Sequence, residues 1–217
     1  MHFPVDLFCI RKHTYIHKLF ISYLKKEHQM AQAKTLTQAE LDQVLRYVST
    51  KRYAKRDRCL ILTSFWSGMR VGEIANLKMG DVINTDGTIK GEIRLSASQT
   101  KGNTARIVFI PQKLRQEIAD YLTTRHTTLA HIPLFHTDDR LGFSPNSLCQ
   151  WFFWMYKRAG ISGASSHSGR RSFLTALANR GISIHILASL AGHKSIAVTN
   201  KYLQANDDMK RNAVELI

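Results

Sequence analysis

The amino-acid sequence predicts an α+β fold that is mostly helical and carries one small antiparallel sheet. Three observations lead to this prediction. A capped amphipathic helix starts at Thr37, the apolar pattern becomes strand-like between residues 88 and 110, and glycines separate a series of helical segments near the C-terminus. With 217 residues the chain suits one large domain or two small ones and can bury a substantial core.

Residues 1–34 differ in composition from the rest of the chain. They mix aromatic, basic and histidine residues and end in a polar run from Gln29 to Lys34 that is typical of a linker. We interpret them as an N-terminal extension and leave three alternatives open: a helical arm, the remnant of a missing domain, or a partly disordered segment. The main domain is predicted to occupy residues 35–217.

Two helices open this domain. Thr37 and Glu40 form a capping box, in which each side chain satisfies a backbone donor of the other, and apolar residues follow at helical spacing. The basic stretch 51–58 then leads into an apolar helix that runs from Cys59 to Trp66 and ends at Gly68.

A short helix from Val71 and a β-hairpin come next. Residues 88–95 and 106–110 are expected to form the two strands, joined by the polar, glycine-containing link 96–105. Pro111 closes the second strand because it cannot continue a ladder of hydrogen bonds.

The remaining helices are predicted from caps, glycines and apolar spacing. They cover residues 113–124, a segment capped by Ser144 and Pro145, and residues 169–180, 183–191 and 195–204. The capped segment carries four large side chains that we expect in the core: Trp151, Phe152, Trp154 and Met155.

The charge balance restricts the class of partner. Lysine and arginine number 31 against 16 aspartate and glutamate, so the formal net charge is +15. Such a chain favours a polyanion, with nucleic acid as the first candidate. An anionic membrane surface is the alternative, but it requires an amphipathic anchor or a lipidation motif, and we find neither clearly. No apolar run in the sequence is long enough to span a bilayer.

Cysteine and histidine spacing argues against a metal centre. The cysteines are odd in number and widely spaced, which indicates reduced thiols in a cytosolic protein: Cys9, Cys59 and Cys149. Three evenly spaced histidines lack a convincing carboxylate or cysteine partner: His126, His131 and His136. We therefore predict no metal site.

Six side chains spread over the chain carry the functional hypothesis: Arg70, Lys101, His167, Arg170, His193 and Tyr202. Together they suit attack by a phenol oxygen on a phosphodiester. The transition state carries extra negative charge on its non-bridging oxygens, and preorganised cationic donors stabilise it. Arginine suits this task because its planar fork forms two parallel hydrogen bonds with phosphate. Arg70 and Arg170 both stand near the starts of predicted helices, where anions are favoured.

The other residues have roles in the same chemistry. Tyr202 is the candidate nucleophile, and because a free phenol has a pKa of about 10, it needs a base such as a neutral His167. Lys101, in the predicted hairpin link, can protonate a leaving alkoxide. Glu73 can orient Arg70. Taken singly, each is more often an ordinary surface, capping or salt-bridged residue, so the hypothesis depends on their order and spacing together.

This order of residues resembles the tyrosine recombinase (phage integrase) family. The matching stretches are 68–74, 100–102 with 106–111, 167–170, and 190–195 with 199–202. The resemblance covers about residues 35–210 and implies the catalytic fold of that family. It also implies a site-specific DNA recombinase in which Tyr202 attacks the scissile phosphate, forms a 3′-phosphotyrosyl bond and releases a 5′-hydroxyl. Neither a metal nor a nucleotide cofactor is implied.

The resemblance implies a role for each residue at the phosphate. Arg70 and Arg170 hold it, and His193 bonds a non-bridging oxygen. His167 assists proton transfer, and Lys101 is the general acid toward the 5′-oxygen.

Double-stranded DNA is the implied partner. The family's usual assembly is four protomers on two duplexes. For the chain without DNA, a monomer remains an alternative. We expect six basic residues to contact DNA, with a solvated basic face as the alternative for the first four: Lys51, Arg52, Lys55, Arg56, Arg171 and Lys194. The implied protein is cytoplasmic, bacterial or phage-encoded, and nucleoid-associated.

Two features depart from the family pattern. Arg171 stands where the family commonly has a histidine, and the segment before Thr37 is too short for the N-terminal DNA-clamp domain of most members. The chain is therefore either a catalytic fragment or a short member, such as the fimbrial-switch recombinases. Two other functions stay open: a non-catalytic DNA-binding regulator with the same fold, and a type IB topoisomerase, which shares the chemistry without exchanging strands.

Overall fold

The computed structural model describes residues 33–100, 103–139, 141–202 and 214–215. The chain divides after Gln32 into two units, and the fold given below is that of the second, Ala33–Ile217. The expectations for residues 1–32, Lys101 and residues 203–213 lie outside the described residues.

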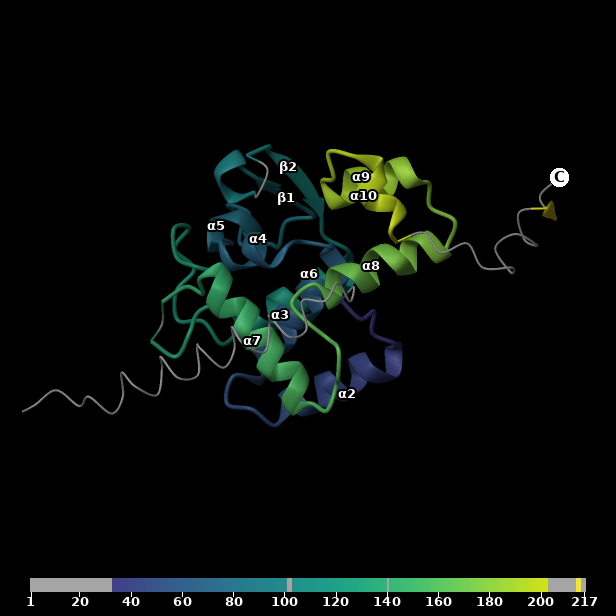
Figure 1. Cartoon of the computed structure of the whole chain (residues 1–217). Helices are drawn as coiled ribbons and strands as arrows, with labels where there is room; N and C mark the ends of the chain where they lie inside the picture. Colours follow the sequence, from purple (N-terminus) through teal and green to yellow (C-terminus); the bar gives the residue numbers. More distant parts are fainter. Residues whose placement is uncertain (1–32, 101–102, 140, 203–213, 216–217) are drawn as a thin grey trace, which may run out of the picture. The chain divides into compact units, whose positions relative to one another are not determined.

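The described part is mostly helical, as predicted (Figure 1). Its helices are α2 (Gln38–Ser49), α3 (Ala54–Ser67), α4 (Val71–Ala75), α5 (Met79–Val82), α6 (Gln112–Leu122), α7 (Pro145–Arg158), α8 (Ser168–Asn179), α9 (Ile184–Ala191) and α10 (Ile196–Asn200). The strands are β1 (Glu92–Leu95) and β2 (Arg106–Phe109), with a short 3-10 helix, Ala97–Gln99, between them. Among these helices, none is both long and apolar enough to cross a lipid bilayer.

Helix α3 organises the packing and contacts α2, α6 and α8 (Figure 1). It begins at Ala54, earlier than the predicted start at Cys59, because part of the basic stretch joins the helix. Arg56 and Asp57 turn inward there and pair with each other, with 2.8 Å between Nη2 and Oδ1. The helix ends, as predicted, at Gly68, whose φ of 61° is left-handed.

The capping signals predicted from the sequence are present. The Thr37 side chain accepts a hydrogen bond from the Glu40 N–H, and the Glu40 carboxylate accepts one from the Thr37 N–H. Ser144 caps α7 in the same way by accepting a hydrogen bond from the N–H of Ser147.

Three of the four large side chains of α7 that we expected in the core pack there. Phe152 and Met155 are buried and Trp151 is half-buried against the core cluster, whereas Trp154 is half-buried outside it. The ring of Trp154 lies against the side chains of Lys157 and Arg158, so this face of the helix packs against cations and not against the core.

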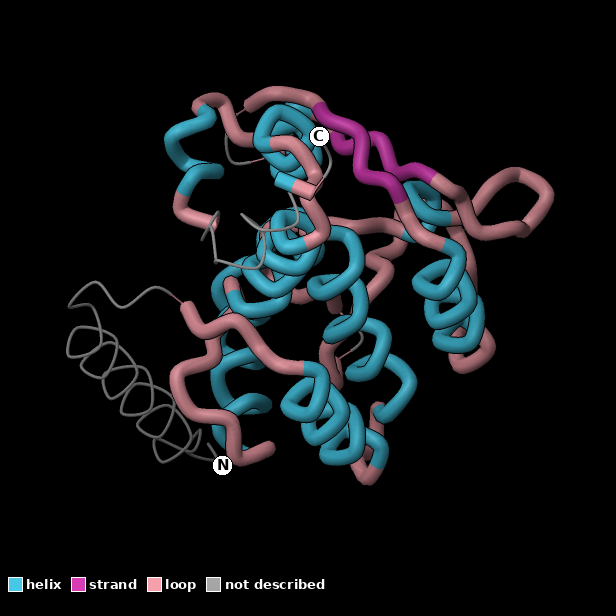
Figure 2. Tube along the Cα trace, turned by 90° about the vertical axis from the view of Figure 1, so that its right-hand side faces the viewer, coloured by secondary structure: helices cyan, strands magenta, loops and turns pink. Residues whose placement is uncertain are grey.

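The hairpin is shorter than predicted (Figure 2). β1 starts at Glu92 because the preceding residues pair backward: Ile89 bridges Ile83, and the Lys90 N–H bonds the carbonyl of Val82. In the antiparallel register, Ile93 faces Val108 and Leu95 faces Arg106. Since side chains alternate along a strand, Arg106 lies on the same face of β2 as the buried Val108.

Helices α9 and α10 join the main packing through α8. α8 packs along α3, while α9 contacts α8 and α10 (Figure 1). Leu187 and Ala191 of α9 are buried but lie outside the main hydrophobic cluster. Apolar contact with that cluster therefore does not by itself hold α9 and α10 in place, and polar contacts contribute.

Candidate active site

Arg70 stands at the start of α4 and reaches the end of α9. Its Nη1 donates to Glu73 Oε1 at 3.0 Å and its Nη2 donates to the carbonyl of Gly192 at 2.9 Å. Its backbone N–H also donates to Glu73 Oε2, at 2.7 Å. Glu73 therefore fixes both the backbone and the guanidinium of Arg70, whose side chain keeps 26% of its surface exposed.

Arg170 lies deeper, in the first turn of α8, and is only 5% exposed. Its Nη1 donates to the carbonyl of Gly68 at 2.6 Å, and its Nη2 donates to that of Ala191 at 2.7 Å. Burial, and then the nearby charges of Arg70 and Arg106, lower the pKa of Arg170 to about 10, so it stays charged at neutral pH.

Three consecutive carbonyls at the end of α9 each accept a hydrogen bond from a different arginine. The pairs are Leu190 with Arg106 (2.9 Å), Ala191 with Arg170 (2.7 Å) and Gly192 with Arg70 (2.9 Å). The last carbonyls of a helix lack partners within the helix and carry its negative dipole end, which explains their attraction for cations. The two arginines expected to hold a phosphate thus meet at one helix end.

Arg106 was not among the site residues predicted from the sequence. Its Nε donates to Glu73 Oε1 at 3.2 Å and its Nη2 donates to Oε2 at 2.6 Å, while the side chain is 9% exposed. The available signal was its place on the inward face of a strand, in register with the buried Val108, where an arginine needs a buried partner.

Glu73 is ionised between these two arginines. Burial raises the pKa of the Glu73 carboxyl, but the hydrogen bonds and charge of Arg106, followed by those of Arg70, outweigh burial and bring that pKa below its ordinary value. A buried carboxylate that holds two cations gives both guanidiniums a defined orientation.

His193 follows the three carbonyls and joins the cluster. Its Nε2 lies 2.9 Å from Arg170 Nη2, and its Nδ1 lies 2.8 Å from the hydroxyl of the buried Thr199. Arginine can only donate, so Nε2 is the unprotonated nitrogen here and Nδ1 carries the hydrogen. Burial, and then the charges of Arg170, Arg70 and Arg106, lower the pKa of His193 to about 4, so the ring is neutral at neutral pH.

Tyr202 lies against His193. Their rings stack with centroids 5.9 Å apart and an interplanar angle of 15°, and the Tyr202 N–H donates to the carbonyl of Thr199 at 2.9 Å. The guanidinium carbon of Arg171 lies 5.8 Å from the centre of the phenol ring. The candidate nucleophile and Arg170 therefore both contact the imidazole of His193, Tyr202 on its face and Arg170 at Nε2.

Three further candidates remain: two are near the cluster residues in sequence, and one lies outside the described residues. His167 immediately precedes α8, three positions before Arg170, with an exposed side chain and its backbone N–H bonded to Ser165 Oγ at 3.3 Å. Lys194 is exposed next to His193. Lys101 lies outside the described residues, so its position relative to the arginines stays a prediction.

One expected DNA contact needs correction. Arg56 is not a surface cation: its side chain is 7% exposed and is bound to Asp57 and to the carbonyl of His136. Helix α3 starts before this residue and turns it inward, which the charge pattern did not reveal. Lys55 donates to Asp120 at 2.7 Å, although 44% of its side chain is exposed.

Lys51 and Arg52 remain exposed surface cations. The Lys51 ammonium lies 4.1 Å from the centre of the Tyr47 ring, and the Arg52 guanidinium lies 5.1 Å from that of Tyr53. Both charges thus stay accessible to an anion, in contrast to Arg56.

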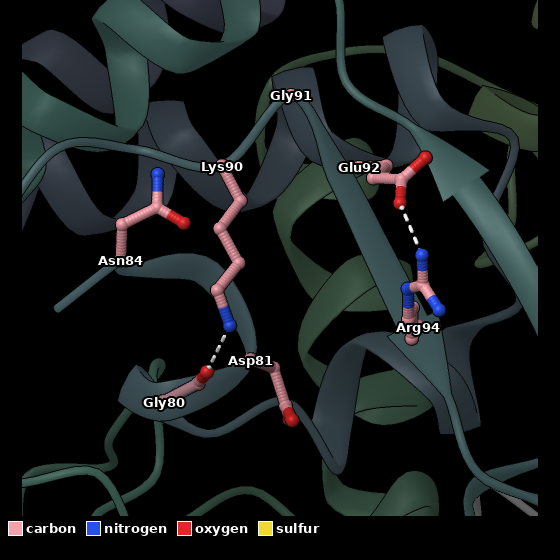
Figure 3. A pocket seen from close by; sticks show the side chains of 7 residues that line it. All are labelled: Gly80, Asp81, Asn84, Lys90, Gly91, Glu92 and Arg94. Carbon is pink, nitrogen blue, oxygen red and sulfur yellow. Dashed lines mark hydrogen bonds and ion pairs between the residues drawn. The ribbon is translucent and has the colours of Figure 1, made fainter.

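An open pocket of about 330 Å³ lies apart from these residues, beside α5 and β1 (Figure 3). Its cations have neighbouring partners: Lys90 Nζ donates to the carbonyl of Gly80 at 2.6 Å, and Arg94 pairs with Glu92 at 3.0 Å. None of the predicted site residues lines it. Among the described residues, no group of three or more histidines, cysteines or carboxylates is arranged to hold a metal ion.

Comparison with known proteins places the chain in a family. Residues 34–209 match the model of the phage integrase family, and the chain belongs to that family. It is 30% identical over 185 residues to the tyrosine recombinase XerA of Pyrococcus furiosus, across 84% of this chain and 61% of that protein. It is 27% identical over 172 residues to the tyrosine recombinase XerC of Lactobacillus delbrueckii, across 76% of this chain and 56% of that protein. The chain thus spans only part of the length of these relatives.

Solved structures show the same fold. The Tn1549 transposon integrase in complex with a circular intermediate DNA matches with a TM-score of 0.72 at 18% identity, over 87% of this chain and 67% of that one. The XerA recombinase crystal structure matches with a TM-score of 0.67 at 24% identity, over 86% of this chain and 66% of that one. The predicted tyrosine-recombinase catalytic fold is therefore confirmed.

Proposed function

We propose that this chain is the catalytic part of a site-specific DNA recombinase that cleaves and rejoins strands through a 3′-phosphotyrosyl intermediate. One observation carries this proposal: Arg70, Arg170 and His193 meet at the end of α9, and the ring of Tyr202 stacks on His193. A phosphate at this place would meet two cations, one imidazole and one phenol oxygen. Membership in the phage integrase family supports the same conclusion.

The reaction is a transesterification. The Tyr202 oxygen attacks phosphorus as the bond to the 5′-oxygen breaks, so one phosphodiester replaces another and no external energy source is needed. The phenol proton passes to His167, and the leaving 5′-oxygen takes a proton from Lys101. Arg70 and Arg170 stabilise the charge that develops on the non-bridging oxygens.

The hydrogen bonds of His193 within the chain bear on its role. Its Nε2 accepts a hydrogen bond from Arg170, whereas bonding to a phosphate oxygen requires an N–H at that atom. When a phosphate oxygen replaces His193 as the acceptor for Arg170, the other tautomer of His193 presents Nε2–H to a non-bridging oxygen.

Double-stranded DNA is the proposed partner, and the net charge of +15 supports it. We propose phosphate contacts from Lys51, Arg52, Lys55, Arg171 and Lys194, and a working assembly of four protomers on two duplexes. The Tn1549 integrase relative was solved in complex with DNA, and so was XerH, bound to a palindromic difH substrate.

Nicked suicide duplexes built from repeats that flank the gene test the proposal. The chain should become covalently attached to the cleaved strand. Tyr202→Phe should abolish the adduct, while Tyr121→Phe should retain it because that hydroxyl donates to the carbonyl of Leu134 in the core. An adduct that survives in Tyr202→Phe would contradict the assignment of the nucleophile.

The same experiment separates the alternatives. Supercoil relaxation without joint molecules would indicate a type IB topoisomerase. Sequence-specific binding without any adduct would indicate a non-catalytic regulator with the same fold.

A further inference from the structure

We propose that Arg106 is a positioning residue for the strand-cleavage site, acting through Glu73 on Arg70 and through the end of α9 on His193. The inference rests on the proposed function for its kinetic consequences, but its structural part concerns contacts within this chain. Arg106 lies on the first residue of β2, and its guanidinium forms hydrogen bonds with two other elements.

The first contact is with α4. Nε and Nη2 of Arg106 hold both oxygens of Glu73, at 3.2 and 2.6 Å, and Glu73 Oε1 also accepts from Arg70 Nη1 at 3.0 Å. Glu73 is 1% exposed, so water cannot replace a lost partner easily. If Arg106 is removed, the carboxylate keeps Arg70 as its cation partner and its geometry is free to change. The orientation of Arg70 therefore depends on Arg106.

The second contact is with α9. Nη1 of Arg106 donates to the carbonyl of Leu190 at 2.9 Å, and the aliphatic part of its side chain fills the space beside Gly192. A Cβ built on Gly192 would lie 2.7 Å from Arg106 Cδ. The residue that follows is His193, so Arg106 supports the turn from which the imidazole projects.

A purely structural role and a positioning role make different predictions. Arg106 is 9% exposed and its donors are bonded inside the protein, so it is not placed to add affinity for DNA. Its loss should affect the orientation of the reacting groups, and a displacement of about 1 Å can cost about 100-fold in rate. The expected signature is a lower rate of cleavage with little change in DNA affinity.

The carboxyl of Glu73 gives a second signature. Burial raises its pKa, and the hydrogen bonds and charge of Arg106 are the largest influences that lower it. Without Arg106 that pKa rises, and protonation of Glu73 releases Arg70 as the pH falls. Arg106→Gln should therefore lose cleavage activity on the acid side at a higher pH than the unchanged chain, and Glu73→Gln in the same chain should abolish this difference between the two pH profiles.

Arg125 provides a matched control. It is also a partly buried arginine that donates to backbone carbonyls, those of Leu134 at 3.3 Å and Pro133 at 3.2 Å, but it lies on the chain after α6, away from the site. Arg125→Gln should lower the thermal midpoint while leaving the cleavage rate and its pH profile unchanged. Arg106→Lys, which can keep one ionic contact with Glu73, should recover part of the rate lost in Arg106→Gln.

Two measurements on the full chain decide the inference. Hydrogen exchange without DNA should show faster exchange of α9 and α10 amides in Arg106→Gln and Arg106→Lys than in Arg125→Gln. Single-turnover cleavage of saturating suicide duplex should fall about 100-fold in Arg106→Gln, with the dissociation constant changed less than about 3-fold. Unchanged exchange in α9 and α10, or a rate loss that matches the affinity loss, would overturn it. If the wild-type chain forms no adduct, the proposed function is overturned. The hydrogen-exchange comparison still tests whether Arg106 supports α9 and α10.

Discussion

Replacement of Gly192 by alanine tests the packing at the end of α9. Gly192 has a φ of 60°, a left-handed conformation that costs an L-residue about 1–2 kcal/mol. An added Cβ would also lie 2.7 Å from Arg106 Cδ and 3.2 Å from its Nε. Displacing a well-packed side chain costs about 1–3 kcal/mol more. We therefore expect Gly192→Ala to lose about 2–5 kcal/mol of unfolding free energy.

Gly181 supplies the control for the backbone component. Its φ of 79° is also left-handed, but a Cβ there would meet no atom within 4 Å. Gly181→Ala should lose only the about 1–2 kcal/mol of conformational strain. Since a domain of this size loses about 2–4 °C per kcal/mol, the thermal midpoint of Gly192→Ala should lie clearly below that of Gly181→Ala.

Thermal unfolding followed by circular dichroism measures the difference, and cleavage of the suicide duplex reports on the site. Equal losses of midpoint in the two variants would refute the claim that Arg106 fills the space beside Gly192. A cleavage rate in Gly192→Ala equal to that in Gly181→Ala would refute the claim that this contact positions the site.

Two further predictions follow from burial and charge. Because the pKa of His193 is about 4 in the folded chain against an ordinary 6.5, the unfolded chain binds more protons between these values, and stability should fall as the pH falls from 6.5 to about 4. Urea denaturation as a function of pH should show this decline, and His193→Gln should flatten it; an equally steep decline in the variant would contradict the assignment. Arg56→Gln should lose about 3–5 kcal/mol because it leaves the Asp57 carboxylate buried without its cation, with no change in the salt dependence of binding to a DNA duplex. Arg52→Gln should do the reverse: the slope of log affinity against log salt should fall by about one, at nearly constant stability. If Arg56→Gln changes the salt dependence and Arg52→Gln changes the stability, the two arginines have been assigned wrongly.

Local signals in the sequence predicted most of the helices. The capping box at Thr37, the serine cap of α7 and the glycine after α3 act over a few residues, and each is found where it was expected. The predicted start of α3 and the predicted length of β1 were wrong because both depend on side-chain burial and backbone pairing that the apolar pattern does not show. Arg56 and Asp57 enter the helix because the interior accommodates them as a pair, and the chain before β1 pairs with α5.

The candidate site shows the same division. Residue types and their order predicted two arginines, two histidines and a tyrosine as candidates, because the chemistry of a phosphodiester restricts which side chains can serve it. The position of Arg106 on the same strand face as the buried Val108 was a weaker signal, because its two partners, Glu73 and the carbonyl of Leu190, come from different elements and could not be predicted.

The sequence by itself determined the fold class, the basic character of the chain and the set of chemically capable side chains, because these follow from local backbone preferences, charge and functional groups. Only the tertiary structure decided which arginines share a helix end, which cation is buried with a carboxylate, and which nitrogen of His193 carries the hydrogen. Those properties depend on contacts between segments far apart in the chain, where burial and neighbouring charges determine the state of each group.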